Sequence, residues 1–468
     1  MDEIIRNTGV TLLMESYTDD GNNLFNSLRL AGFNPEAVVI DDDGFLPDGM
    51  ISMYGYFLGD YEVAGESFAK NGRIVADITD DSILGHPRYF NQISIPEYWE
   101  ITATNSDGKI MDKNIERGHI YYAEPKHRRL VGIVEWTDSK RNVRLSDHYN
   151  KYGALYARTT FNAKGQRVCK SYFSVEHKEI IVENYVTKDI MLNTEAGVEI
   201  FSSKADFVAY FLRVTGLDKG RIMYNSLSTP FFSTLQLEEN NHGDVMFWQE
   251  NTGDDIPGNM QFILKGNAKR TNKVFVQKKN SFDRLMELGA SPEAVKYLGF
   301  IYEFKRVNKG RANALICTNS DNIIQLAKLV EELPVLHFNV VALTEMSSKL
   351  MDFDKYENVS LYPCAKPSVQ EALFAECDYY LDINRESEIL SAVQNAFMNN
   401  MLVLGFEEVA HNRNYVSAAH LFNENDCDKL IDLIKSTMAD EEILKNEIDV
   451  QNKAALFESV ERYQELLG

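Results

Sequence analysis

Residues 379–406 read YYLDINRESEILSAVQNAFMNNMLVLGF and define one β-α-β unit. The apolar run Tyr379–Ile383 predicts a strand, and the polar turn after it leads into a predicted helix over Glu386–Met398. A second apolar run, Met401–Phe406, predicts the next strand. Ligands of parallel sheets lie outside the carboxyl ends of the strands, so the turn after Ile383 is the place to look for a site.

The helix of this unit lacks a carboxylate pair that similar sites carry. Retaining glycosyltransferases of this build usually have two glutamates about two helical turns apart at this turn and helix. Here Glu388 is followed seven positions later by Asn395, and Glu386 by Val393. The sequence thus predicts the β-α-β unit of such a site, but only one residue of the expected glutamate pair is present. This combination indicates a binding or partner subunit rather than a free-standing catalyst.

The composition describes a globular protein with room for two or three domains. The chain has 468 residues, of which 44% are hydrophobic and 11% aromatic, so each domain can bury a core. A net charge of −22 argues against nucleic acid as a partner, because phosphate-backbone binding needs a basic surface. No apolar run approaches the ~18 residues of a membrane span, and no signal peptide is recognised, so we expect a cytosolic protein.

The reactive side chains predict no metal or cofactor site. The five cysteines are scattered without CxxC spacing, and the nine histidines show no HxxxH or HExxH spacing. Neither a zinc site nor a disulfide framework is therefore expected. No G-x-S-x-G elbow or P-loop is present. We predict no catalytic residue, no metal and no cofactor for this chain.

The periodicity of the apolar residues divides the chain into three domains. Residues 1–55 and 203–304 predict a first Rossmann-like domain. Residues 56–202 change to a period of two and predict an inserted extended β-sheet domain. Residues 305–440 predict a second Rossmann-like domain, and a C-terminal helix over about 440–468 is expected to pack back on the first. The predicted fold class is α/β with an inserted antiparallel β domain, in which the two Rossmann-like domains face one another across a cleft.

Short apolar runs predict the strands of the Rossmann-like domains. They alternate with helical patterns, among them Ala205–Val214 and Asp321–Leu333, as in parallel sheets. The predicted strands are Val10–Met14, Ala37–Ile40, Arg221–Tyr224, Asp244–Trp248, Lys273–Val276, Leu298–Phe304, Ala314–Cys317, Phe338–Leu343 and Val359–Leu361.

The inserted domain is predicted to be an antiparallel meander of eight or nine strands. Turn signals such as Asn105-Ser-Asp-Gly and Asn162-Ala-Lys-Gly separate the runs. A sheet of this length has edges and at least one face that need cover. Another copy of the chain or another subunit could cover them, and so could the sheet's own domain; these alternatives stay open here. The predicted strands begin near Gly72, Ile93, Trp99, His119, Leu130, Tyr156, Val168, Glu179 and Gly197.

Two polar stretches of the first domain are better explained by local structure than by a ligand. After the first strand, Glu15-Ser-Tyr-Thr-Asp-Asp-Gly enters a helix, where Asp19 and Asp20 would repel phosphate and can serve as capping residues. After the second strand, Asp41-Asp-Asp-Gly-Phe-Leu-Pro-Asp-Gly lacks the alternating ligands and distal glutamate of a calcium loop. We interpret the first stretch as a helix cap and the second as a turn into the inserted domain.

Cations for a diphosphate are missing from the expected place in the second domain. Four cations precede the strand Ala314–Cys317 and so lie at its amino end. The Thr318-Asn-Ser-Asp stretch after that strand contains none. This loss is independent of the broken glutamate pair. The four cations are Lys305, Arg306, Lys309 and Arg311.

The remaining candidates follow strands of the second domain at their predicted carboxyl ends. Each could hydrogen-bond a hydroxyl or peptide group of an acceptor, or could only cap a helix. The candidate acceptor-binding residues are Glu345, Lys349, Asp382, Asn384, Glu386, Glu388 and His411.

Three segments carry a resemblance to a known family: DDDGFLPDG at 41–49, ALTEMSSKL at 342–350 and YYLDIN at 379–384. Together with the order of the domains, they make essentially the whole chain similar to the stabilising, co-activating subunit of the bacterial accessory-Sec glycosyltransferase, the GtfB-type protein. The resemblance implies a glycosyltransferase-B-like architecture that lacks the donor-site residues.

The resemblance also implies partners. In that family a similar but catalytic subunit transfers N-acetylglucosamine from the UDP-sugar to Ser/Thr of a serine-rich repeat adhesin before export. The co-activator meets the catalytic subunit through the inserted β domains and helps bind the unglycosylated acceptor. We therefore expect a hetero-oligomer, up to a tetramer, in the cytoplasm or peripherally at the cytoplasmic face of the cell membrane.

Two other hypotheses stay open at this point. The chain could be an active retaining glycosyltransferase that uses a UDP-sugar donor with Glu386 or Glu388. It could also be a scaffold that binds only its partner subunit and never the acceptor.

Overall fold

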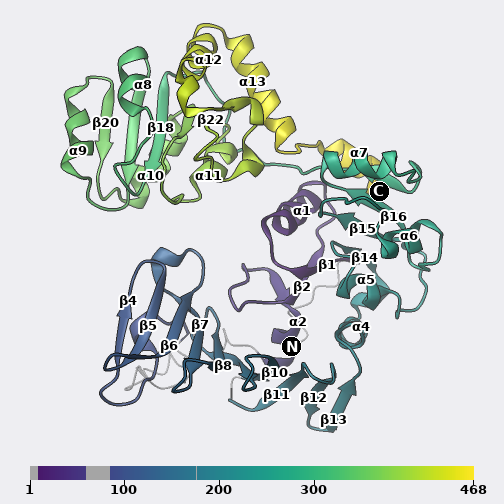
Figure 1. Ribbon diagram of the computed structural model, residues 1–468. Coiled ribbons are helices and arrows are strands. Elements are labelled where there is room, and N and C mark those ends of the chain that lie inside the picture. Colours follow the sequence, from purple (N-terminus) through teal and green to yellow (C-terminus); the bar gives the residue numbers. More distant parts are fainter. Residues whose placement is uncertain (1–8, 60–84, 175) are drawn as a thin grey trace. The chain divides into compact units, whose positions relative to one another are not determined.

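The computed structural model describes residues 9–59, 85–174 and 176–468. The chain divides into two compact units, the first ending at Leu298 and the second beginning at Gly299. The first unit contains a parallel sheet and the inserted antiparallel sheet, and the second contains another parallel sheet (Figure 1).

The parallel sheet of the first unit follows a Rossmann order. Its strands are β1 (Val10–Ser16), β2 (Glu36–Asp41), β3 (Met50–Ser52), β14 (Arg221–Tyr224), β15 (Asp244–Trp248), β16 (Thr271–Val276) and β17 (Val295–Tyr297). They are arranged as β17-β16-β15-β14-β1-β2-β3, and all neighbours are parallel. The order reverses between β1 and β14, which is the position where such sheets bind ligands. The helices of this unit are α1 (Asp19–Leu30), α2 (Met53–Leu58), α4 (Lys204–Val214), α5 (Thr229–Thr234), α6 (Gly258–Leu264) and α7 (Lys279–Glu287).

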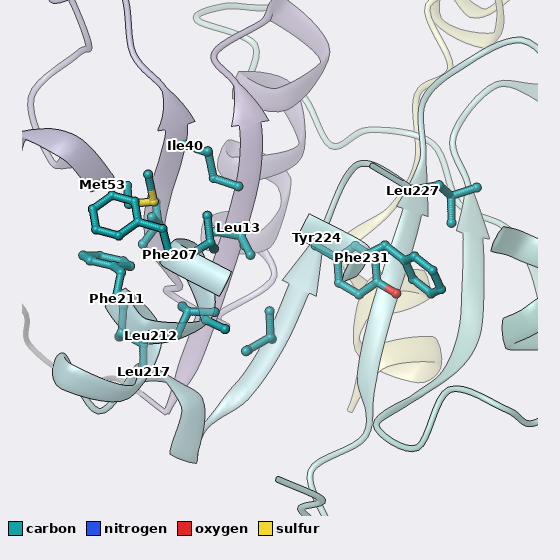
Figure 2. Packing of buried hydrophobic residues seen from close by; sticks show 14 of the residues in the cluster. Leu13, Ile40, Met53, Phe207, Phe211, Leu212, Leu217, Tyr224, Leu227 and Phe231 are labelled. Carbon is teal, nitrogen blue, oxygen red and sulfur yellow. The ribbon is translucent and has the colours of Figure 1, made fainter. Parts of the chain in front are cut away.

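One hydrophobic core joins this sheet to its helices. Met53 of α2 and Phe207 of α4 are fully buried and pack in the same cluster as Ile40 of β2 (Figure 2). Both helices begin at a serine cap: Ser52 Oγ accepts from Gly55 N at 2.9 Å, and Ser203 Oγ accepts from Asp206 N at 3.1 Å. Removing a side chain of this size from water contributes roughly 1.5–3 kcal/mol.

The inserted domain is a simple antiparallel meander of ten strands in the described residues. Consecutive strands are neighbours throughout, in the order β13 to β4. The strands are β4 (Glu100–Ala103), β5 (Asp107–Asp112), β6 (Ile115–Tyr122), β7 (Val131–Thr137), β8 (Val143–Tyr149), β9 (Leu155–Phe161), β10 (Arg167–Phe173), β11 (Glu179–Asn184), β12 (Ile190–Thr194) and β13 (Gly197–Phe201).

The predicted antiparallel meander is present, but some of its predicted strands differ from those observed. β5, β8 and β12 were not predicted, the run at Ile93 is not a strand, and the run at Gly72 lies outside the described residues. β8 lacks the alternation of apolar and polar residues that predicts a strand, because it buries a charged residue, Asp147. That carboxylate is compensated, since Arg158 Nε donates to it at 2.5 Å and Trp136 Nε1 at 2.9 Å.

A mixed polar and aromatic contact attaches the inserted sheet to the parallel sheet. The Lys204 ammonium at the start of α4 lies 2.8 Å from Asp41 Oδ1 at the end of β2 and 3.2 Å from Glu183 Oε1 on β11. Tyr54 of α2 stacks on Tyr172 of β10, with ring centroids 4.3 Å apart. The strands β10 to β12 share the core of the first unit, so their inner face is covered by their own domain. The strands β5 to β9 contribute to a separate small cluster.

The second unit repeats the Rossmann order. Its strands are β18 (Asn313–Thr318), β19 (His337–Ala342), β20 (Val359–Tyr362), β21 (Tyr379–Asp382), β22 (Leu402–Phe406) and β23 (Leu421–Phe422). They are arranged as β20-β19-β18-β21-β22-β23 and all are parallel. The switch point therefore lies between β18 and β21. Its helices are α8 (Leu326–Glu332), α9 (Ser348–Met351), α10 (Pro367–Glu376), α11 (Ala392–Met398), α12 (Cys427–Ala439), α13 (Glu441–Ala454) and α14 (Val460–Leu467).

Three predicted elements need correction. The helix expected over Glu386–Met398 begins only at Ala392, because Leu390 and Ser391 have positive φ angles of 60° and 43°. The helix expected from Asp321 begins at Leu326, after a left-handed residue. The segment Leu298–Phe304 is not a strand of a sheet; within it only Phe300 forms a β-bridge, to Phe457.

The DDDGFLPDG stretch is a tight turn packed against the inserted sheet. Asp42 Oδ1 accepts from Gly44 N at 2.7 Å, and Asp43 Oδ1 accepts from Phe45 N at 2.9 Å, which is typical of Asx turns. Gly44 has φ +89°, and a Cβ there would lie 2.9 Å from the Asn150 Cα. The turn predicted from the sequence is therefore present, and Gly44 is required by both its conformation and its close approach.

Replacing Gly44 by alanine should destabilise the first unit by about 2–4 kcal/mol, from left-handed backbone strain and overpacking together. Urea unfolding followed by tryptophan fluorescence measures this, because Trp99, Trp136 and Trp248, the three tryptophans of the chain, lie in that unit. Gly49→Ala is the matched control: its φ is +85° but no atom lies within 4 Å, so it should cost only about 1 kcal/mol. Equal losses in the two variants would contradict the packing explanation.

Candidate functional site

The switch point of the second unit is filled by the chain's own hydrogen bonds. Thr318, the last residue of β18, donates its hydroxyl to Asn384 Oδ1 at 2.9 Å. Asn384 Nδ2 in turn donates to the Glu386 carbonyl at 3.0 Å and the Ser387 carbonyl at 3.3 Å. Both Thr318 and Asn384 are buried. The Glu386 and Ser387 carbonyls thus accept from the Asn384 side chain instead of from backbone N–H groups one turn later. The helix therefore does not begin at Glu386.

Asp382 and His411 form a charged pair beside this loop. Asp382 is buried at the end of β21 and accepts from His411 N at 2.8 Å and His411 Nδ1 at 2.6 Å. His411 Nε2 lies 2.6 Å from the Glu386 carbonyl, so both ring nitrogens face acceptors. The hydrogen bond to Asp382 raises the pKa of His411 to about 9, against the opposing effect of burial. An imidazolium satisfies both acceptors, and it ties β21 to the loop.

Glu388 and Asn395, the broken carboxylate pair, both serve the start of α11. Glu388 Oε1 accepts from Val393 N at 2.8 Å, at the positive end of the helix. Asn395 Nδ2 donates to the Leu390 carbonyl at 2.6 Å and so closes the strained turn. Position 395, where a second glutamate was expected, therefore stabilises the turn before α11.

The other candidates are exposed. Glu345 and Lys349 follow β19, and Lys349 Nζ lies 3.4 Å from the Asp321 carbonyl. The Glu386 side chain is also exposed, although its carbonyl is used by Asn384 and His411. The structure thus brings Asp382, Asn384, Glu386 and His411 together in one hydrogen-bonded group, and the charge of Glu388 helps to raise the pKa of His411. Contact of any of them with an acceptor stays a prediction.

The cations that precede β18 lie at the opposite edge of the sheet, as predicted. Arg311 Nε donates to Asp378 Oδ2 at 3.0 Å, and Arg306 pairs with the same carboxylate, which is fully buried just before β21. Burial would raise the pKa of Asp378, but the hydrogen bonds from Arg311 and Arg306 lower it overall. These guanidinium groups are committed to the fold at the amino ends of the strands.

The switch point of the first unit contains a polar group that the sequence reasoning missed. Glu15, near the end of β1, accepts the hydroxyls of Ser226 and Thr229, the latter at 3.1 Å, and its backbone N donates to Asn225 Oδ1 at 3.3 Å. The signal was available, because Asn225 and Ser226 directly follow β14, the parallel neighbour of β1. The cap of α1 is Thr18, which accepts from Gly21 N at 3.0 Å; Asp19 and Asp20 only occupy the first turn.

The described residues contain neither a metal-binding cluster nor a helix that could span a membrane. Within residues 9–59, 85–174 and 176–468, no group of His, Cys, Asp and Glu side chains could hold a metal ion. In the same ranges no helix has the length and apolar character needed to cross a bilayer.

Two Rossmann-type sheets, one carrying a ten-stranded antiparallel insertion, define a glycosyltransferase-B-like protein. The predicted α/β fold class with an inserted antiparallel β domain is therefore confirmed. Four domain models match the chain in succession: the GtfB N-terminal domain at 12–57, the GtfB middle domain at 99–202, the GtfB third domain at 204–288 and the GftB/GlyA-F C-terminal domain at 314–451.

Similarity to individual proteins extends over almost the whole chain. It is 37% identical to the UDP-N-acetylglucosamine–peptide N-acetylglucosaminyltransferase stabilizing protein GtfB of Streptococcus pneumoniae serotype 4, over 97% of this chain and 98% of that protein. The protein of the same name from Streptococcus gordonii is 38% identical over 97% of both chains. A crystal structure of a GtfA/B complex bound to UDP and GlcNAc matches with a TM-score of 0.84 and 37% identity, over 98% of this chain and 99% of that one. The chain belongs to the GtfB family, which confirms the resemblance inferred from its motifs.

The Asp382–His411 pair should make the second unit sensitive to pH in a defined direction. The folded-state pKa of His411 is above the unfolded value, so the stabilisation is fully present below about pH 6.5 and is lost as pH rises through about 9. NMR titration should find the His411 ring near pKa 9 in the wild-type protein and lower by at least one unit in Asp382→Asn.

A double-mutant cycle with Asp382→Asn and His411→Gln gives the energy of the pair. We expect a coupling of about 1–3 kcal/mol at pH 6, measured by chemical unfolding, and a smaller value at pH 10, where the neutral imidazole keeps only an uncharged N–H donor to Asp382. A coupling that does not change between these pH values would show that the imidazolium is not the interacting species.

Proposed function

We propose that this protein is a non-catalytic subunit that stabilises a catalytic O-GlcNAc transferase subunit and binds the Ser/Thr-rich adhesin polypeptide during O-glycosylation. One observation carries the proposal: the second-unit switch point, where a donor nucleotide would bind, is closed by Thr318, Asn384 and the Asp382–His411 pair. The names of the GtfB relatives, which describe stabilisation of a transferase, support it.

The electrostatics of the second unit support the absence of donor binding. A nucleoside diphosphate needs cations or open helix N-termini at the carboxyl ends of the strands. Here Arg306 and Arg311 bind Asp378 at the other edge, and Glu388 occupies the start of α11. Carboxylates at this end would repel a diphosphate.

The acceptor side of the proposal relies on the exposed polar residues. Glu345, Lys349 and Glu386 can hydrogen-bond hydroxyl and peptide groups, which a neutral Ser/Thr-rich polypeptide presents in quantity. Such an acceptor needs no basic surface, which agrees with the net charge of −22.

The inserted sheet is the proposed contact with the catalytic subunit. Its edge strand β13 exposes Val198 and Ile200, at 58% and 67% of their full areas. An exposed edge with β-branched residues is suited to pairing with another chain. We propose a hetero-oligomer, up to a tetramer, located in the cytoplasm or at the cytoplasmic face of the membrane.

Activity measured with and without this chain tests the stabilising role. The catalytic subunit co-expressed with this protein should co-purify with it and transfer GlcNAc to a Ser/Thr-rich peptide, and the catalytic subunit alone should lose most of its soluble yield or its rate. The isolated chain should not bind UDP or UDP-GlcNAc in calorimetric titration. Micromolar binding that is abolished by Glu386→Ala or Glu388→Ala would instead favour the alternative, an active retaining glycosyltransferase.

The acceptor contacts are tested by single substitutions in the assembled complex. Glu386→Gln and Glu345→Gln should each weaken binding of a Ser/Thr-rich peptide about tenfold, the loss expected for one hydrogen bond to a charged group. Glu376→Gln is the matched control, because Glu376 is exposed at the end of α10 and away from the carboxyl ends of the strands. Peptide binding that is unchanged in every variant would favour a scaffold that binds only its partner.

A further inference from the structure

A cavity of about 290 Å³ lies where the turn after β2 meets the inserted sheet. It shares no lining residue with either switch point. Its walls come from the turn itself and from strands β6 to β10. The lining residues are Asp42, Asp43, Phe45, Tyr121, Tyr122, Ala123, Gly132, Ile133, His148, Tyr156 and Lys170.

Lys170 supplies hydrogen-bond donors to this cavity without a carboxylate partner of its own. Among the described residues its ammonium forms no ion pair or side-chain hydrogen bond; it lies 4.9 Å from the ring centroid of Tyr172 and 6.0 Å from that of Tyr156. Burial lowers the pKa of Lys170, and the neighbouring carboxylates only partly offset this effect. A lysine held in this way has donors that a ligand can use.

Asp42 supplies acceptors on the same cavity. Its Oδ1 accepts from Gly44 N, the carboxyl group also accepts a hydrogen bond from the Ser52 side chain, and burial raises its pKa. Lys170 only donates and Asp42 only accepts, yet the two form no ion pair. A hydroxyl is a neutral group whose single oxygen can both accept from the first and donate to the second, whereas an amide needs two atoms to do so. The Asp42 and Asp43 carboxylates would repel an anion, and the Lys170 ammonium would repel a cation.

The tyrosines offer ring surfaces rather than further hydrogen-bond donors. Tyr121 donates its hydroxyl to Glu135 at 3.2 Å, Tyr122 donates to the Asp107 carbonyl at 2.9 Å, and Tyr156 donates to the Asp42 carbonyl at 3.2 Å. The cavity therefore combines ring surfaces with the Lys170 ammonium as donor and the Asp42 and Asp43 carboxyl groups as acceptors. His148, whose Nε2 lies 3.0 Å from Thr159 Oγ1, adds a further polar group to the wall. That arrangement matches a single hydroxyl on a small apolar stem.

The backbone around the cavity departs from a regular ladder. The register shifts between Tyr121 and Tyr122 and again between His148 and Tyr149. Such bulges occur beside binding sites, where they redirect side chains. The small residues Ala123 and Gly132 reduce the bulk of the wall, and the volume is at the lower limit for ligand pockets. One side chain fits these dimensions better than a nucleotide-sugar.

We propose that this cavity is a subsite for one Ser or Thr side chain of an extended acceptor polypeptide, whose hydroxyl bridges the Lys170 ammonium and the Asp42 carboxyl group. The proposal rests on the acceptor binding proposed above and adds a second place of contact, on the inserted sheet. The polypeptide side chain is favoured over a nucleotide-sugar because the volume of about 290 Å³ is at the lower limit for ligand pockets.

The test compares Lys170→Met with Lys164→Met in the complete complex with the catalytic subunit. Lys164 lies in the exposed β9–β10 turn, so the control makes the same chemical change outside the cavity. Binding is measured for a Ser/Thr-rich peptide and for the same peptide with alanine at those positions. The wild-type complex and Lys164→Met should prefer the Ser/Thr peptide, and Lys170→Met should reduce that preference about tenfold.

Two further measurements separate a binding role from a structural one. The urea midpoint of Lys170→Met should be unchanged or raised, because the variant removes a largely desolvated charge that has no carboxylate partner. Acylation by an amine-reactive reagent, located by mass spectrometry, should be slowed at Lys170 by the Ser/Thr peptide and not by the alanine peptide.

The outcomes also distinguish this proposal from the proposed function. If the wild-type complex does not bind the Ser/Thr peptide, the proposed acceptor role itself fails. If it binds but Lys170→Met keeps the full preference, only the subsite is wrong. Protection of Lys170 by free N-acetylglucosamine in place of the peptide would assign the cavity to a sugar and overturn the proposal.

Discussion

The Lys204 ammonium, placed between Asp41 of β2 and Glu183 of β11, is the contact on which the architecture of the first unit depends. The chain leaves the parallel sheet after α2, builds ten antiparallel strands, and must return to the same sheet at α4. Lys204 stands at that return point and binds both sheets, at 2.8 and 3.2 Å. The Tyr54–Tyr172 stack closes the same junction on its apolar side. A half-buried ion pair of this kind adds little net stability, but it defines one geometry among many.

In both Rossmann-type sheets a buried aspartate binds an arginine at the amino ends of the strands. In the first unit Arg270 Nε donates to Asp244 Oδ2 at 2.7 Å, and in the second Arg311 Nε donates to Asp378 Oδ2 at 3.0 Å. Both aspartates are fully buried. These arginines are committed at the amino ends of the strands and are therefore not available at the carboxyl ends. The second unit closes its carboxyl edge further, through Thr318 and Asn384.

Sequence reasoning was accurate where burial is uniform and failed where side chains compete with the backbone. Asp244–Trp248 was predicted with correct bounds, because a strand buried on both faces is a continuous apolar run. Glu386–Met398 has a helical pattern, but Asn384 takes the carbonyls of Glu386 and Ser387 and the helix begins at Ala392. The periodicity of apolar residues does not reveal such a side-chain to backbone hydrogen bond.

Residue types and their spacing were enough to predict the fold class, the β domain inserted after the second strand, the broken glutamate pair at Glu388 and Asn395, and the cations at the amino ends of the strands. The roles of the polar residues required the three-dimensional fold, because their hydrogen-bond partners are distant in sequence. Asp382 binds His411, 29 positions away, and Glu15 binds Ser226, 211 positions away. The fold also placed Lys170 and Asp42 on one cavity, since the meander folds β10 back toward the turn after β2.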